Sequence, residues 1–343
     1  MPKTIPLTAA EPCSSLSPSW QQQLAQALSD PLQLLHQLKL DSSIFGDFNA
    51  ANKQFSLKVP QAYINKMTPQ NPQDPLLLQV MTQSQEMLPV AGYKRDPVGD
   101  LNASQVPGLL HKYHGRVLLI TTGACAIHCR YCFRRHFPYA EQQAGRQQWQ
   151  EAIAYIQRDT SIEEVILSGG DPLVLSDDKL SALLSQLEAI PHLSRLRIHT
   201  RLPVVLPDRI TSALVNRLSA SRLNTCMVIH ANHAQEIAEA ETHALRKMQA
   251  AGISLLNQAV LLNGINASLS AQQNLSRALF NAGVLPYYLH CLDAVEGAAH
   301  YDLAHSQALQ LIKQMRKTLP GYLVPRLVRE IAGEMSKTPA DEL

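Results

Sequence analysis

From about residue 106 onward, the chain alternates short apolar runs with longer amphipathic stretches. Most of these runs are apolar at successive positions, which is typical of parallel strands that helices cover on both faces. The stretches between the runs, such as 177–188 and 276–282, repeat their apolar positions every three or four residues, as the outer helices of βα units do. The six predicted strands cover residues 116–121, 164–168, 195–199, 225–230, 253–259 and 286–290.

This order of elements predicts an α/β fold in the form of a partial (β/α)6 barrel. The first hundred residues differ, because they are rich in Gln, Pro, Ser and Leu and show helical periodicity near 20–28 and 31–35. We therefore expect a small N-terminal helical domain over 1–100, the barrel over 101–322, and a C-terminal segment over 323–343.

Composition narrows the class of partner. A formal net charge of +2 over 343 residues gives no reason to expect nucleic acid or an anionic membrane as the main partner. No apolar segment approaches the roughly 20 residues of a membrane span, so we expect a cytoplasmic protein. Three of the six cysteines, Cys13, Cys226 and Cys291, are scattered along the chain and are expected to be free thiols. Small solutes are the expected ligands.

The other three cysteines, Cys125, Cys129 and Cys132, form a C-x3-C-x2-C motif directly after the first predicted strand. Three thiolates can hold three irons of a [4Fe–4S] cube and leave the fourth iron open for a small molecule. A zinc ion would instead need a fourth ligand, for which His128 or His136 is available. The spacing, with an aromatic residue just before the third cysteine, resembles the cluster loop of radical S-adenosylmethionine enzymes.

Polar residues recur where the predicted strands end, and in barrels of this kind the chemistry gathers at those ends. The second strand ends in a Ser-Gly-Gly-Asp run, and paired glycines allow a backbone to approach a ligand closely, although a simple tight turn also uses them. One unit after the cysteine motif, the run resembles the glycine-rich motif that holds the amino end of S-adenosylmethionine. The cofactor-binding residues expected at these strand ends are Ser168, Gly169, Gly170, Asp171, His230 and Gln258.

Several longer stretches point to one family. They read VPGLLHKY at 106–113, CAIHCRYCFRR at 125–135, RLPVVLP at 201–207, LNQ at 256–258 and SKTP at 336–339. Together with the barrel they resemble the lysine 2,3-aminomutase family, over about residues 106–340. Two more stretches, CFRRHFPY at 132–139 and REIAGE at 329–334, look like the branch that makes β-lysine for the modification of bacterial elongation factor P.

The resemblance implies a role for several single residues. That family uses pyridoxal phosphate, and the match places its covalent attachment on Lys337, whose amine should then be partly buried or close to other positive charge. Arg116 falls at the phosphate-binding position, and Arg134 matches the residue that binds the substrate carboxylate. Asp293 and Glu330 fall where acids bind the distal ammonium of lysine.

This chain also departs from the family pattern. The metabolic enzymes usually carry aspartate at the position of Glu330, and they have a glycine run where this chain has Gly333, Glu334, Met335 and Ser336. They continue into a cysteine-containing extension that helps to assemble the oligomer, so their tetramer is not assumed for a chain that ends at Leu343.

The resemblance therefore implies an isomerase, a lysine 2,3-aminomutase that converts L-α-lysine to β-lysine, expected as the (R) isomer. Its expected cofactors are a [4Fe–4S] cluster, S-adenosylmethionine and pyridoxal 5′-phosphate. A flavodoxin or ferredoxin is the expected electron donor, and elongation factor P and its lysine ligase are the expected functional partners. The alternatives are an aminomutase for glutamate or arginine, a radical enzyme without pyridoxal phosphate, and a non-catalytic iron–sulfur or zinc protein.

Overall fold

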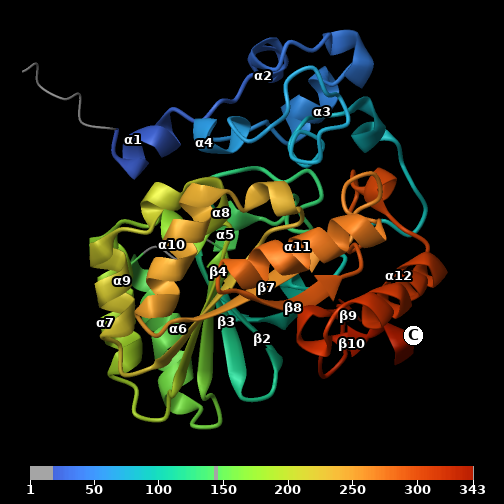
Figure 1. Cartoon of the computed structure of the whole chain (residues 1–343). Helices are drawn as coiled ribbons and strands as arrows, with labels where there is room; N and C mark the ends of the chain where they lie inside the picture. Colours follow the sequence, from blue (N-terminus) through green and yellow to red (C-terminus); the bar gives the residue numbers. More distant parts are fainter. Residues whose placement is uncertain (1–17, 143–145, 343) are drawn as a thin grey trace, which may run out of the picture.

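A computed structural model describes residues 18–142 and 146–342, and within them one ten-stranded sheet organises the protein (Figure 1). The strands lie in the sheet in the order in which they occur in the chain. Neighbouring strands from β3 to β9 are parallel, whereas β1, β2 and β10 pair antiparallel at the two edges. The strands are β1 Ser104–Val106, β2 Leu109–Tyr113, β3 Arg116–Thr122, β4 Glu164–Gly169, β5 Arg195–Thr200, β6 Asn224–Ile229, β7 Ser254–Val260, β8 Leu285–His290, β9 Arg326–Arg329 and β10 Thr338–Pro339.

The predicted fold class is confirmed, because the six apolar runs become the parallel strands β3 to β8. The structure adds β9 as one more parallel strand, which the sequence analysis missed because only four residues form it. The short antiparallel strands β1, β2 and β10 were missed as well.

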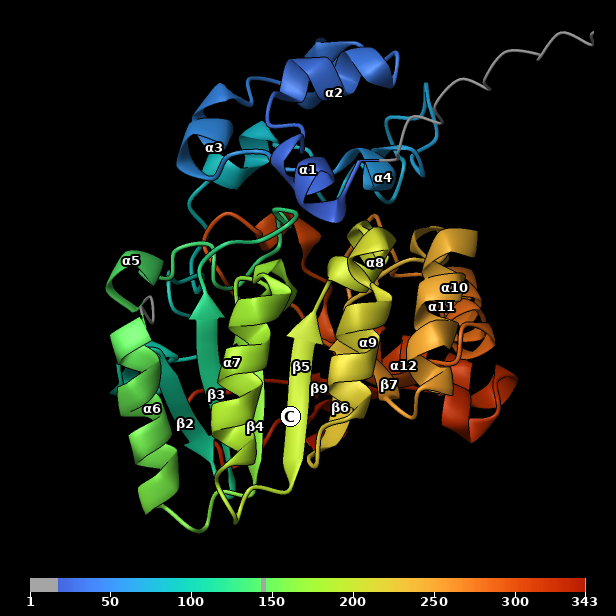
Figure 2. The same ribbon diagram turned by 90° about the vertical axis from the view of Figure 1, so that its left-hand side faces the viewer.

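Helices cover the outside of the sheet (Figures 1 and 2). The predicted helix at 177–188 is α7, and its buried leucines recur at helical spacing at positions 180, 183, 184 and 187. The side chain of Ser176 caps its first turn. The helices are α1 Trp20–Ala25, α2 Pro31–Gln37, α3 Asn49–Gln54, α4 Gln61–Ile64, α5 Tyr139–Gln142, α6 Arg146–Arg158, α7 Asp177–Glu188, α8 Leu202–Val205, α9 Ser212–Ser219, α10 Glu239–Ala250, α11 Leu269–Asn281 and α12 His305–Thr318.

The N-terminal helices lie over the end of the barrel toward which the parallel strands point, as the arrowheads of β3 and β5 show in Figure 2. Leu34 and Tyr63 from this segment belong to the same buried hydrophobic cluster as Leu167 and Leu196 from the sheet. The N-terminal helices and the sheet therefore share one hydrophobic core. No helix among the described residues is long and apolar enough to cross a membrane.

Candidate active site

The three cysteines of the C-x3-C-x2-C motif lie in the loop between β3 and α5, under the N-terminal helices. The backbone N–H of Cys132 donates to the carbonyl of Cys129 at 3.1 Å, which folds this part of the loop into a turn. Burial raises the pKa of Cys132 to about 11, and the nearby Cys129 contributes to the rise. Burial also raises the pKa of Cys125, with contributions from Cys132 and Cys129. Three thiols that act on one another from a single loop fit a cluster bound through three irons.

The N-terminal segment holds this loop in place. Lys58 Nζ donates to the carbonyl of Cys125 at 2.9 Å. Glu86 of the N-terminal segment forms ion pairs with Arg130 at 2.5 Å and Arg135 at 2.7 Å in the cysteine loop, and all three side chains are fully buried. Because a buried carboxylate is stable as an ion only when it is paired, the two arginines and Glu86 need one another.

Both histidines that were considered as a fourth zinc ligand make contacts with backbone carbonyls. Nδ1 of His128 lies 2.8 Å from the carbonyl oxygen of Ser56, and Nε2 of His136 lies 3.3 Å from that of Glu296. Within the described ranges, no group of three or more His, Cys, Asp or Glu side chains is arranged to hold a metal ion as it stands. A cluster of four irons differs from a single ion, because it spreads its thiolate ligands further apart.

The Ser-Gly-Gly-Asp run packs directly on the cysteine loop. Gly169 has φ +122°, and a Cβ there would lie 2.5 Å from the carbonyl oxygen of Thr122. A Cβ on Gly170 would lie 2.3 Å from the carbonyl oxygen of Ala124. Asp171 accepts hydrogen bonds from Thr200 Oγ1 and the Arg201 N–H, both at 2.7 Å. Glycine is therefore required at both positions because the backbone at the end of β4 approaches the backbone at the end of β3 closely, which the sequence did not reveal. Asp171 connects the ends of β4 and β5.

Five charged side chains form a continuous chain of ion pairs next to this loop. Arg134 Nε lies 2.6 Å from one oxygen of Asp100, and Lys112 Nζ lies 2.5 Å from the other. Lys112 Nζ also lies 2.8 Å from Oε1 of Glu330, whose Oε2 lies 2.6 Å from Lys337 Nζ. The order is therefore Arg134, Asp100, Lys112, Glu330, Lys337, with the signs alternating. This arrangement connects the expected substrate-carboxylate residue with the expected cofactor lysine.

The pKa of Glu330 in this ion-pair chain and the pKa of the neighbouring Asp293 are shifted in opposite directions. Burial opposes the charge of Glu330, but Lys337 and Lys112 hold its pKa well below the ordinary value. Burial raises the pKa of Asp293 to about 7, and the charge of Glu330 adds to the rise. Oδ1 of Asp293 is buried without a hydrogen-bond partner among the described residues. Such an oxygen fits a cationic ligand that the site receives from outside.

The expected cofactor residues divide between two regions. Arg116, at the start of β3, stacks over the ring of Tyr113 at 4.7 Å, and both Glu330 and Arg116 affect the pKa of that tyrosine. Arg116 therefore lies on the Lys337 side. Nε2 of His230 lies 2.9 Å from the hydroxyl of Tyr131, so His230 lies beside the cysteine loop. Ser168 and Gln258 lie on strands, Ser168 near the end of β4 and Gln258 within β7. The Oγ of Ser168 accepts a hydrogen bond from Nη1 of Arg134 at 3.2 Å.

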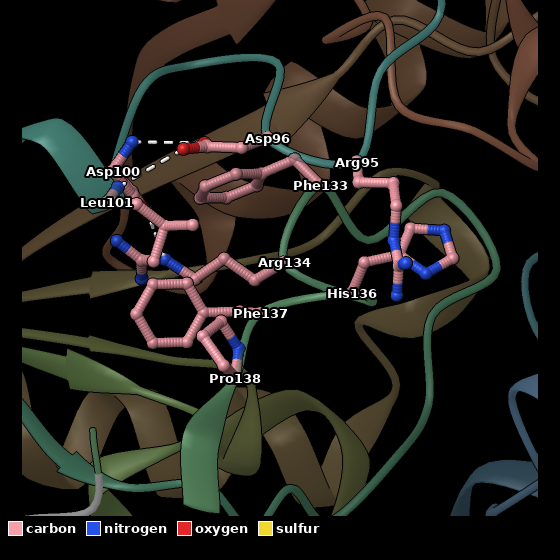
Figure 3. Close-up of a pocket in the computed structure, with 9 residues that line it drawn as sticks. All are labelled: Arg95, Asp96, Asp100, Leu101, Phe133, Arg134, His136, Phe137 and Pro138. Carbon is pink, nitrogen blue, oxygen red and sulfur yellow. Dashed lines mark hydrogen bonds and ion pairs between the residues drawn. The ribbon is translucent and has the colours of Figure 1, made fainter. Parts of the chain in front are cut away.

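A pocket of about 250 Å³ opens beside Arg134 (Figure 3). The guanidinium of Arg134 lies 4.9 Å from the ring centroid of Phe133 and 5.9 Å from that of Phe137. The pocket thus combines apolar walls with the first members of the ion-pair chain. The residues that line it are Arg95, Asp96, Asp100, Leu101, Phe133, Arg134, His136, Phe137 and Pro138.

Some residues of this site were missed from the sequence. Asp100 and Lys112 had no assigned role, although Lys112 stands in the family stretch 106–113. Of the three scattered cysteines, Cys226 and Cys291 are free thiols in the structure, whereas Cys13 lies outside the described residues.

Comparison with known proteins gives a consistent result. The Radical SAM superfamily model matches residues 119–268. The L-lysine 2,3-aminomutase of Escherichia coli (strain K12) is 49% identical over 325 residues, which are 94% of this chain and 94% of that protein. The enzyme of the same name from Haemophilus influenzae is 49% identical over 96% of this chain and 97% of its own length. That of Clostridium subterminale is 36% identical over 84% of this chain and 69% of its own length.

Proposed function

We propose, since this chain belongs to the lysine 2,3-aminomutase family of radical S-adenosylmethionine enzymes, that it moves the amino group of L-lysine from C2 to C3 and releases β-lysine. The chain is thus an isomerase. The observation that carries the choice of substrate is 49% identity over nearly the whole length of two lysine enzymes. The buried, unpartnered Asp293 supports it, because a lysine ligand supplies the cation that this carboxylate lacks.

Each cofactor has a candidate place among the residues described above. Cys125, Cys129 and Cys132 would hold the [4Fe–4S] cluster, and we propose Lys337 as the attachment point of pyridoxal phosphate and Arg116 as its phosphate ligand. When bound, the cluster and S-adenosylmethionine supply one-electron activation of a C–H bond, and pyridoxal phosphate supplies the group that lets nitrogen migrate. The residues proposed to contact S-adenosylmethionine are Ser168, Gly169, Gly170, His230 and Gln258, with Asp171 acting by joining the ends of β4 and β5.

The protein's own part is to bind and orient lysine by its charges. Arg134, fixed by Asp100 and Ser168, offers a guanidinium to the substrate carboxylate. Asp293 offers its unpartnered oxygen to the ε-ammonium at the other end. Glu330 has both oxygens engaged by Lys112 and Lys337. Once the Lys337 amine is used by the cofactor, the oxygen that faced it becomes available to the substrate ammonium.

The test is incubation of the reconstituted, reduced enzyme with lysine, glutamate or arginine in separate reactions, followed by chiral analysis of the products. We expect β-lysine from lysine alone, as the (R) isomer. Formation of β-glutamate or β-arginine at a higher rate than β-lysine would contradict the proposed substrate.

We also propose that the β-lysine is used to modify elongation factor P, with a flavodoxin or ferredoxin as electron donor. The stretches 132–139 and 329–334 support this branch of the family. The measurement is the mass of elongation factor P from cells with and without this gene. An unchanged mass would separate the aminomutase activity from this use of its product.

Asp293→Asn is expected to lower kcat/KM for lysine by roughly ten- to a hundredfold. The change removes one charge-assisted contact, worth about 1.5–3 kcal/mol, and each 1.36 kcal/mol is about tenfold. The pKa of about 7 gives the pH dependence: in free enzyme Asp293 becomes ionised as the pH rises through about 7, so kcat/KM for lysine should rise over that range. Asp293→Asn should lack this rise.

The matched control is Asp178→Asn, the same substitution at an exposed position of α7. It should retain the wild-type rate and pH profile. A wild-type profile in Asp293→Asn as well would show that Asp293 does not bind the ε-ammonium.

Glu330→Gln and Glu330→Asp are expected to differ in stability. The glutamine leaves Lys112 and Lys337 without their shared carboxylate, and breaking such a largely buried pair costs about 3 kcal/mol, so the midpoint of thermal unfolding should fall. The aspartate keeps the charge but is one methylene shorter, so it should retain most of the stability and change the rate or stereochemical purity, with lysine still preferred over glutamate. Wild-type unfolding midpoints and wild-type kinetics in both variants would show that Glu330 is not part of the proposed site.

A further inference from the structure

Beneath the cysteine loop, a buried arginine is fixed from several directions. Arg201 follows β5, and its side chain is 6% exposed. Its Nη2 donates to Glu236 Oε2 at 2.8 Å, to Gln79 Oε1 at 2.7 Å and to the hydroxyl of Tyr63 at 3.1 Å. Gln79 and Tyr63 belong to the N-terminal segment, so the position of this guanidinium depends on both parts of the molecule.

The other edge of the same guanidinium contacts a cluster ligand. Nη1 of Arg201 donates to Sγ of Cys129 at 2.7 Å. The backbone N–H of Arg201 is held at 2.7 Å by Asp171, which also accepts from Leu173 at 3.0 Å in the turn after β4. Arg201 is therefore not free to move away from the sulfur, and none of the steps proposed for lysine binding uses it.

A donor and a positive charge at a ligating sulfur favour the more negative, reduced form of an iron–sulfur cluster. The effect is strong here because the site is buried and weakly screened. Glu236 carries the opposite charge, but it contacts Nη2, whereas the sulfur contacts Nη1. The arginine is thus the nearer of the two charges, and its influence should exceed that of Glu236.

We propose that Arg201 is a positioning residue that raises the reduction potential of the [4Fe–4S] cluster through its N–H···S contact with Cys129, and that Glu236 partly offsets its charge. This inference deepens the proposed function, because it rests on the cluster. It does not depend on lysine being the substrate.

The experiment is a redox titration of the reconstituted enzyme, followed by electron paramagnetic resonance in the absence of lysine and S-adenosylmethionine. Arg201→Gln should disfavour reduction by at least tenfold, which is about 59 mV for one electron. Glu236→Gln should shift the potential in the opposite direction. The reduction potential of the double variant Arg201→Gln/Glu236→Gln should lie between those of Arg201→Gln and the wild type. Both charges are lost in this variant, and the charge of Arg201, which is nearer to the sulfur, has the larger effect.

Iron and sulfide content and circular dichroism identify the variants that fold and hold the cluster. Arg201→Gln leaves Glu236 unpaired and could therefore fail to fold or to hold the cluster. In that case the double variant tests the proposal, since it leaves neither buried charge without its partner. Arg209→Gln is the control: that arginine is also fully buried but donates to the carbonyl of Leu173, so the potential should stay unchanged.

A wild-type potential in the double variant, or shifts of the same sign in Arg201→Gln and Glu236→Gln, would overturn the proposal. The first result would show that the contact does not matter to the cluster, and the second that the pair acts only by supporting the fold. Because lysine is absent, a failure of the substrate assignment would appear only in the product assay and would leave this titration unaffected.

Discussion

Lys337→Ala is expected to abolish both β-lysine formation and the borohydride-trapped adduct of pyridoxal phosphate. The two lysine amines of the ion-pair chain differ in their contacts with the described residues: Nζ of Lys337 contacts one carboxylate oxygen, whereas Nζ of Lys112 contacts Asp100, Glu330 and the carbonyl of Val98. The amine of Lys337 can therefore leave its carboxylate partner and bind a cofactor at a smaller cost in free energy than the amine of Lys112 can. Absorbance spectra and peptide mapping after borohydride reduction give the measurement.

The visible spectrum of the cluster provides the internal control for this variant. The cysteines lie on a different segment from Lys337, so iron and sulfide content should equal that of the wild type. Mapping that found the adduct on Lys112 or any other lysine would refute the assignment of Lys337, even if the variant were inactive.

Alanine at Cys125, Cys129 or Cys132 is expected to abolish formation of 5′-deoxyadenosine. Loss of one thiolate leaves two protein ligands for a cluster that needs three, so the loss should exceed that of any substrate-contact variant. Product chromatography after anaerobic reduction with S-adenosylmethionine is the measurement.

Cys226→Ala and Cys291→Ala are the matched controls, since both residues are free thiols outside the cysteine loop. They should retain the cluster and the activity. If a variant at Cys125, Cys129 or Cys132 cleaved S-adenosylmethionine at the wild-type rate, the cluster would have to be held in another way.

The fold could be predicted largely because most of its long parallel strands contain continuous apolar runs. Parallel strands buried on both faces stand out from their surroundings, as 164–168 does. The four-residue β9 carries Arg326 and Arg329 at its ends, and its burial comes from neighbours supplied by distant parts of the chain. The single core shared by the N-terminal helices and the barrel was also not visible, since apolar periodicity shows which face is buried but not against what.

The candidate site could be predicted only as far as local motifs extend. The cysteine motif is local, and the structure places its three thiols on one loop. The contact of Lys112 with Glu330 joins residues 218 positions apart, and that of Arg201 with Cys129 joins residues 72 apart, so neither leaves a pattern in a single sequence. The roles of the individual residues stay predictions until the variants above are measured.

The match between strand order and chain order has a consequence for biosynthesis. As the polypeptide leaves the ribosome, each new parallel strand finds its neighbour already made, so the sheet can grow by addition at one edge without waiting for distant segments. Lys337 and Glu330 lie beyond the end of β9 and are synthesised after all the parallel strands. If Lys337 holds pyridoxal phosphate as proposed, the cofactor is retained only by chains that have been translated past the last parallel strand, and products truncated before that point stay without it.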